Sequence, residues 1–241
     1  MGGDETMSPG TLSLVGVGPG APDLITLRAA RLIAAARLVA YPTTEKGAAL
    51  ARDIAAPHLA PNAEHLPIVI PMSPARAPAQ AAYDAAAATL GARLAAGDDA
   101  VFLCEGDPLF YGSAMYLLAR LGRAAKVEIV PGVTSLTAAA AAAARPLAAR
   151  NEILKILPAP LPDATLRAEL AGAPAAAIIK IGRHFDRIRA LLHDTGHAAS
   201  ALVIEHATTP RQHVAPLAAL PAGERPYFST ILCYRGAEAW R

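Results

Sequence analysis

The sequence is short of aromatic and charged side chains and contains no long hydrophobic run. Aromatic residues make up 5% of the chain, charged residues 17%, and the formal net charge is +2. So few rings leave little surface for base stacking, and so mild a charge disfavours a nucleic-acid partner. No uncharged apolar stretch is long enough to cross a bilayer, and the nearest, 134–144, is interpreted as a packed alanine-rich helix. Nucleic acids and membranes are therefore not expected as partners.

Residues suited to metal binding and covalent chemistry are also few. The two cysteines, Cys104 and Cys233, lie in apolar strand-like runs and are interpreted as buried free thiols in a reducing cytosol. The histidines form no cluster at ligand spacing, so no metal is predicted, and the lack of a G-x-S-x-G elbow disfavours serine hydrolysis. Residues 1–10 lack the apolar core of a signal peptide, which favours a disordered tail on a cytoplasmic protein.

What the first half contains is a regular alternation of strand and helix patterns. Such an order predicts βαβ units and a mostly parallel sheet. The expected strands are 11–17, 37–41, 65–70, 100–104 and 127–130. The expected helices are 22–36, 47–56, 77–96 and 109–121.

The pattern changes after the chain break at Pro131-Gly132, which divides the chain into an N-terminal α/β domain, 11–130, and a C-terminal one, 131–241. The segment 158–162 is predicted to be a rigid extended connector. The last strand is expected to pair antiparallel with 201–205, which makes the second sheet mixed. The expected strands here are 152–157, 175–181, 201–205 and 227–234, and the expected helices are 136–144, 163–170 and 185–193.

The turn Glu105-Gly106-Asp107-Pro108 follows a buried strand, at the edge where open α/β sheets place their ligand crevice. Gly106 allows a ligand to approach the backbone closely. Pro108 keeps the preceding residue out of the α region, so Asp107 is expected to be extended and aimed outward. The alternative is an ordinary strand-to-helix turn with Asp107 as its cap.

Three more turns follow strands. The run 16–21 fits a dinucleotide pattern loosely, but no acid ends the next strand and Pro19 lacks an N–H, so nicotinamide is disfavoured. In the turn 130–135, Thr134 or Ser135 is able to cap the next helix. The run 180–185 gathers three potential cations around a glycine, which suits a carboxylate, with a solvated helix start as the alternative. Together the four turns favour a bound small molecule over a scaffolding role.

These turns, in this order, resemble the tetrapyrrole (corrin/porphyrin) methyltransferase family, over residues 11–236. The resemblance implies two α/β domains of the class III methyltransferase type, with S-adenosyl-L-methionine in the cleft between them, and a homodimer. Several segments are similar to the branch that methylates carbon C20 of precorrin-2 to give precorrin-3A in cobalamin biosynthesis, namely 41–47, 66–72, 104–112, 145–151 and 180–185.

The resemblance also implies roles for individual residues. Many relatives carry methionine where Ile181 stands. Uroporphyrinogen III methylases often have an Asp-x-Leu turn where this chain has Tyr41-Pro42, a departure that argues against their substrate. The implied cofactor contacts are Pro19, Gly106, Asp107, Pro108, Tyr111, Thr134, Ser135, Ile181 and Ala207. The contacts expected to the macrocyclic substrate come from position at strand ends and not from the resemblance: Arg150, Lys180, Arg183 and His184 for its carboxylates, together with Tyr41.

The implied reaction needs a methyl donor, a nucleophilic ring carbon and the loss of a proton from C20. Asp107 is the first candidate for the base, with a purely hydrogen-bonding role as the alternative, and Glu105 and Tyr41 are weaker candidates. One alternative substrate is the cobalt-loaded ring, cobalt-factor II. A more distant alternative is a non-enzymatic nucleotide-binding module built on the turn at Gly16.

Overall fold

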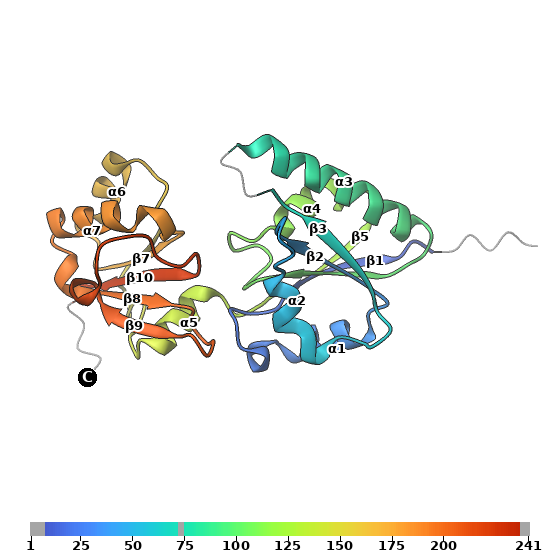
Figure 1. Ribbon diagram of the computed structural model, residues 1–241, viewed down its shortest axis with the longest axis horizontal. Coiled ribbons are helices and arrows are strands. Elements are labelled where there is room, and N and C mark those ends of the chain that lie inside the picture. Colours follow the sequence, from blue (N-terminus) through green and yellow to red (C-terminus); the bar gives the residue numbers. More distant parts are fainter. Residues whose placement is uncertain (1–7, 72–74, 237–241) are drawn as a thin grey trace, which may run out of the picture. The chain divides into compact units, whose positions relative to one another are not determined.

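The computed structural model describes residues 8–71 and 75–236, and the chain divides into two compact units, Met1–Thr134 and Ser135–Arg241 (Figure 1). The division lies four residues beyond the boundary expected after Val130. Most of the expected tail, 1–7, and Met72 lie outside the described residues. Gly10 does not belong to a disordered tail, because it is buried and its N–H donates to the Leu94 carbonyl at 2.8 Å.

The first unit is built on a five-stranded sheet in the order β3-β2-β4-β1-β5. Every neighbouring pair is parallel, which confirms the prediction. β4 is entirely buried, as expected for an unbroken apolar run in the middle of a parallel sheet. The strands are β1 (Thr11–Gly16), β2 (Leu38–Thr43), β3 (Glu64–Val69), β4 (Ala100–Cys104) and β5 (Lys126–Val130).

Helices cover both faces of this sheet (Figure 1). Alternate strand residues pack against α3 and α4 on one face and against α1 and α2 on the other. The prediction of one helix over 22–36 was wrong, because Thr26 ends a 3-10 turn at Pro22–Leu24 and caps a new helix by accepting from the Ala29 N–H. The helices are α1 (Leu27–Ala35), α2 (Leu50–Ala55), α3 (Arg76–Ala95) and α4 (Ala114–Leu121).

The second unit has a five-stranded sheet in the order β6-β7-β10-β8-β9. Only β6 and β7 are parallel, so the mixed sheet and the antiparallel pairing of the last strand with β8 are confirmed. β9 was not predicted, since this short strand has neither an apolar run nor a clear alternation. The strands are β6 (Leu154–Pro158), β7 (Ala175–Ile179), β8 (Ala201–Glu205), β9 (His213–Pro216) and β10 (Ser229–Tyr234).

Helices α6 and α7 pack on this sheet through a cluster of buried apolar side chains that includes Phe185 and Ile188, and α5 contacts β10. The expected extended connector 158–162 is instead a turn, in which Leu161 N–H donates to the Pro158 carbonyl at 3.1 Å. The helices are α5 (Ser135–Ala142), α6 (Asp163–Leu170) and α7 (Phe185–Asp194).

Two further findings concern cysteine and hydropathy. Cys104 and Cys233 are free and buried, as predicted, and burial raises the pKa of the Cys233 thiol to about 12. Both thiols are therefore protonated at neutral pH and unreactive. Within residues 8–71 and 75–236, no helix has the length and apolar character needed to span a bilayer.

Candidate active site

Three glycines bring the first unit's strand-end turns into backbone contact. A Cβ on Gly16 would lie 2.6 Å from the Gly106 carbonyl oxygen and 2.8 Å from the Gly132 Cα. A Cβ on Gly132 would come closer still to that oxygen and lie 2.9 Å from the Gly16 Cα. Real side chains do not tolerate such distances. Glycine is therefore required at 16 and 132 so that the turns after β1, β4 and β5 meet.

Hydrogen bonds hold the first two of these turns together. The Gly106 N–H donates to the Gly18 carbonyl at 2.8 Å, and the Gly18 N–H donates back to the Gly106 carbonyl at 3.2 Å. Gly106 has a φ of +64°, a conformation that glycine adopts without strain. Its Cβ position is open, with the nearest atom, the Val133 carbonyl oxygen, 3.9 Å away. There is thus open space beside this backbone, and the approach of a ligand to it stays a prediction.

Asp107 connects the β4 turn to the β5 turn. Its Oδ1 accepts a hydrogen bond from the Leu109 N–H at 2.9 Å, and its Oδ2 accepts one from the Gly132 N–H at 3.0 Å. Ionised acceptors form strong bonds to backbone amides. The side chain therefore accepts hydrogen bonds from the backbone, and its role as the base stays a prediction.

The two weaker candidates for the base face the interior of the first unit. Burial raises the pKa of the Glu105 carboxyl, while the backbone N–H groups of Glu105 and Ala51 oppose that shift. Tyr41 is buried, with the Arg52 guanidinium 5.8 Å from its ring centroid and the His65 ring also at 5.8 Å. Tyr41 is thus a packed residue of β2.

The other residues expected at the cofactor near these turns run from Pro19 to Ser135, which is the first residue of the second unit. Pro19 and Thr134 are half-buried, Pro108 is buried and Tyr111 is exposed. Tyr111 has a φ of +53°, unusual for a bulky residue, and its ring meets Phe110 edge-on at 5.1 Å. Ser135, the first residue of α5, is exposed.

In the second unit, one edge of the sheet collects the ends of several strands. β10 runs antiparallel to β7 and β8, so its start lies where they end, and Ser229 pairs with Glu205. Several non-glycine residues at this edge have positive φ, which costs free energy and is frequent at functional sites. They are Lys180 (+58°), His206 (+49°) and Thr208 (+68°).

The cationic turn predicted at 180–184 lies at this edge of the sheet, which we therefore call the cationic edge. Lys180 and Arg183 are exposed. Partial burial and the neighbouring charges of Arg187 and Arg183 lower the pKa of His184, which is therefore neutral at pH 7. Ile181 has no exposed surface and packs in the core of the second unit. Its role as a cofactor contact, like that of the half-buried Ala207, stays a prediction.

Arg150 is not brought together with these cations. It precedes β6, and the neighbouring Glu152 accepts a hydrogen bond from the Tyr234 hydroxyl at 2.7 Å, at the last residue of β10. That end of β10 lies at the opposite edge of the sheet from Ser229. Arg150 therefore precedes a strand instead of following one, and its contact with a substrate carboxylate stays a prediction.

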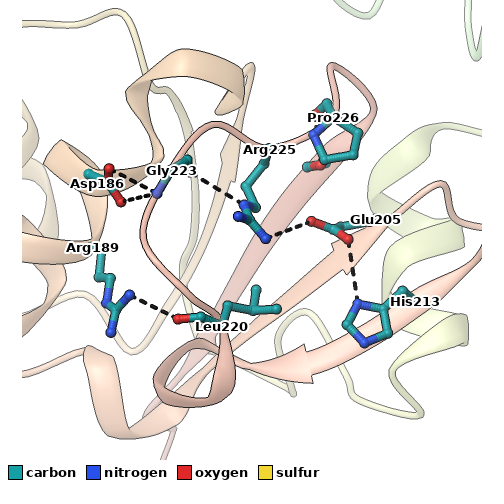
Figure 2. A network of polar contacts seen from close by, with 9 residues as sticks. Asp186, Arg189, Glu205, His213, Leu220, Gly223, Arg225 and Pro226 are labelled. Atoms are coloured by element: carbon teal, nitrogen blue, oxygen red, sulfur yellow. Dashed lines mark hydrogen bonds and ion pairs between the residues drawn. The ribbon is translucent and has the colours of Figure 1, made fainter.

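The sequence analysis missed a polar network at the cationic edge (Figure 2). The Glu205 carboxylate lies 3.7 Å from the Arg225 guanidinium and 3.4 Å from the His213 ring. The Arg225 guanidinium also stacks 4.9 Å from the Phe185 ring centroid. The only sequence signal was Glu205 at the end of a strand, since its partners are remote. In the described part of the chain, no three His, Cys, Asp or Glu residues are grouped as a metal would require.

Comparison with known proteins identifies the family to which the chain belongs. The profile described as Tetrapyrrole (Corrin/Porphyrin) Methylases matches residues 11–221. The cobalamin biosynthesis protein CobIJ of Mycobacterium tuberculosis is 42% identical over 92% of this chain. The match covers only 46% of that relative, so the chain spans about half its length.

Other relatives match along nearly their whole length. The precorrin-2 C(20)-methyltransferase of Sinorhizobium sp is 34% identical over 92% of this chain and 94% of its own. The cobalt-precorrin-2 C(20)-methyltransferase of Salmonella typhimurium is 36% identical over 92% and 95%. A crystal structure of uroporphyrin-III C-methyl transferase from Thermus thermophilus complexed with S-adenyl homocysteine is 26% identical, with a TM-score of 0.69, and covers 93% of this chain and 97% of that one. The turns at Gly16, Gly106 and Gly132 thus occur in a chain that belongs to the tetrapyrrole (corrin/porphyrin) methylase family.

Proposed function

We propose that this protein is an S-adenosyl-L-methionine-dependent C-methyltransferase that transfers a methyl group to C20 of precorrin-2, giving precorrin-3A. One observation carries the proposal: two relatives that match along more than nine-tenths of their length are both named for methylation of C20. The glycine-built turns of the first unit support the donor, and the cationic edge of the second supports an acidic acceptor.

The first-unit turns fit the cofactor because of what they leave open. The Cβ side of Gly106 has no atom closer than 3.9 Å, so a ligand atom has room to approach the backbone there. In the proposal, Pro19, Gly106, Pro108, Tyr111, Thr134 and Ser135 hold the cofactor. When bound, it supplies an electrophilic methyl group on a sulfonium. Residues of these turns position that group and exclude water, which is the main contribution that methyl transfer needs from a protein.

Asp107 serves the cofactor site by fixing the turns. Both of its oxygens already accept backbone hydrogen bonds, which supports a positioning role over that of the base. Asp107 nevertheless stays a candidate for the group that takes the C20 proton. The two roles predict different kinetics for an Asp107 variant.

The second unit is proposed to bind the acidic macrocycle. Lys180 and Arg183 are exposed cations beside a turn that begins with positive φ, and they are suited to pair with ring carboxylates. His184 adds no charge at neutral pH. The cofactor contacts at Ile181 and Ala207 and the homodimer that the resemblance implies remain predictions.

The cobalt-loaded ring is a second candidate substrate, favoured by the 36% identical relative named for it. Its methylated position is the same. Nothing in the described residues is arranged as a metal site, and the proposed reaction does not require the protein to ligate the cobalt.

The test is incubation of the purified protein with isotope-labelled S-adenosylmethionine and either the metal-free or the cobalt-loaded ring, followed by mass spectrometry and NMR of the product. We expect one added methyl group, bound to C20, with one of the two rings preferred. A methyl group at another carbon, or no transfer to either ring, would contradict the proposal. A thermal-shift comparison of S-adenosylhomocysteine with NAD separates it from a nucleotide-binding module, which would favour NAD.

A further inference from the structure

Two adjacent aromatic side chains are exposed at the edge of the second sheet. Tyr227 is 64% exposed and Phe228 is 41% exposed, and their rings meet edge-on with centroids 4.9 Å apart. The sequence predicted both in the last strand, but β10 begins only at Ser229. They therefore lie just outside the sheet, at the edge that carries the cationic turn.

The segment before these aromatics is held firmly. The Gly223 N–H donates to both oxygens of Asp186 at 3.0 Å, and the Arg225 N–H donates to the Gly182 carbonyl at 3.2 Å. The Arg225 guanidinium contacts the Glu205 carboxylate (Figure 2). It also stacks on the Phe185 ring. Two separate parts of the unit, residues 182–186 and Glu205, thus fix one short loop.

The segment is also fixed on its other side. The Phe228 carbonyl accepts a hydrogen bond from the His206 N–H at 2.8 Å, and the Ser229 hydroxyl donates to the Pro226 carbonyl at 2.7 Å. Large apolar side chains that stay exposed on an ordered loop gain nothing for folding. They are already arranged for a ligand, because the entropy of ordering them is lost in folding and not in binding.

The surroundings indicate what that ligand is. Arg225 connects the loop directly to the Gly182 turn, which carries the exposed Lys180 and Arg183. Aromatic faces flanked by cations suit a flat ring system with carboxylates around its rim. We propose that Tyr227 and Phe228 form a fixed aromatic platform that packs against the macrocycle, while Lys180 and Arg183 pair with its carboxylates. This inference rests on the proposed function and assigns the residues that give it substrate specificity.

Glu205 positions this platform. Its side chain is 13% exposed, and its Oε1 has no hydrogen-bond partner within the described residues, so the Arg225 charge at 3.7 Å is its main compensation. A buried carboxylate strongly favours a nearby guanidinium. The ion pair therefore holds Arg225, and with it the loop that presents the two rings.

The test compares the double variant Tyr227→Leu/Phe228→Leu with Ile153→Ala. Ile153 is 66% exposed and precedes β6 at the opposite edge of the sheet, so it is a matched exposed apolar control. Binding of uroporphyrin III, a flat porphyrin with carboxylates around its rim, is followed by fluorescence, and binding of S-adenosylhomocysteine by calorimetry. We expect the double variant to lose about tenfold in uroporphyrin affinity, with cofactor affinity unchanged and Ile153→Ala like the wild type.

Equal uroporphyrin affinity in the folded double variant and the wild type would overturn the platform, even if the wild type methylates C20. If the wild type fails to methylate but binds uroporphyrin through these rings, the platform stands and the proposed reaction falls. No uroporphyrin binding by the wild type would overturn the platform. Should the double variant not fold, Tyr227→Leu alone gives the same test, because its side chain is the more exposed.

Discussion

The strand-end turns of the first unit are held by contacts between backbone groups, whereas those of the second unit present charged and aromatic side chains. In the first unit, Gly16, Gly106 and Gly132 meet backbone to backbone, and the Asp107 carboxylate binds backbone amides. In the second, exposed cations and rings surround the turn at Gly182. A site built from backbone groups tolerates few substitutions, and its backbone groups do not titrate. A side-chain-built site is free to vary with the substrate and responds to pH.

The largest expected effect comes from adding one methyl group to the backbone-built site. In Gly132→Ala the new Cβ would overlap the Gly106 carbonyl, so we expect a loss of about 3 kcal/mol in the free energy of unfolding. Urea unfolding measures it. The control is Gly91→Ala, whose Cβ would meet only Leu121 Cδ2 at 3.5 Å and which should be neutral or stabilising. If Gly132→Ala is as stable as the wild type, the close contact between residue 132 and the Gly106 carbonyl does not constrain these turns.

The next effect separates conformational strain from ligand contact. Gly106 and Gly172 have nearly equal φ, +64° and +69°, and neither has an atom closer than 3.9 Å to its Cβ position. Alanine at either position should therefore cost about 1–2 kcal/mol of stability. Calorimetry should show weaker S-adenosylhomocysteine binding for Gly106→Ala alone. Equal affinities in the two variants would place the cofactor elsewhere.

Asp107→Asn tests whether the first site is held by a carboxylate or uses it as a base. The amide leaves one backbone N–H facing another donor, so we expect a loss of about 1.5–3 kcal/mol together with weaker cofactor binding. Unfolding, calorimetry and single-turnover rates are measured on the same preparation. A variant with normal stability and normal cofactor affinity but a slow chemical step would instead assign Asp107 as the base.

The smallest effect concerns the pH response of the second site. The pKa of His184 is lowered from 6.5, so the ring gains its charge only below that pH. Uroporphyrin affinity should then rise about threefold as pH falls from 6.5 toward 5, an increment that His184→Gln abolishes. The same shift makes the folded state lose stability below pH 6.5, because the unfolded chain binds the proton more readily. An identical pH profile in the variant would exclude His184 as a source of the pH dependence of uroporphyrin binding.

The sequence predicted best those features that depend on neighbouring residues. β4 was found to the residue, because an apolar run is stopped abruptly by Gly106-Asp107-Pro108. The bounds of helix Asp163–Leu170 were also predicted to the residue. The start of α1 was missed because Thr26 competes with the preceding proline turn as the helix start.

The features that were missed depend on tertiary contacts. Glu205 and Arg225 are twenty positions apart, and no local pattern indicates that they pair. Tyr227 and Phe228 have strand-forming side chains, and only the loop that holds them keeps them outside β10. Family resemblance pointed to the turns at Gly16, Gly106 and Gly132 because close backbone contacts require glycine there, whereas strand-end position alone grouped Arg150 with the cationic turn although it precedes β6.

The central claim is that the first-unit turns bind the cofactor and the cationic edge of the second unit binds the macrocycle. Titrating two ligands into two variants tests it most directly. S-adenosylhomocysteine and uroporphyrin III are each titrated calorimetrically into Gly106→Ala and Arg183→Ala. The account predicts that Gly106→Ala loses affinity for the first ligand only and Arg183→Ala for the second only. A folded variant that loses both ligands equally, or the reverse pattern, would contradict it.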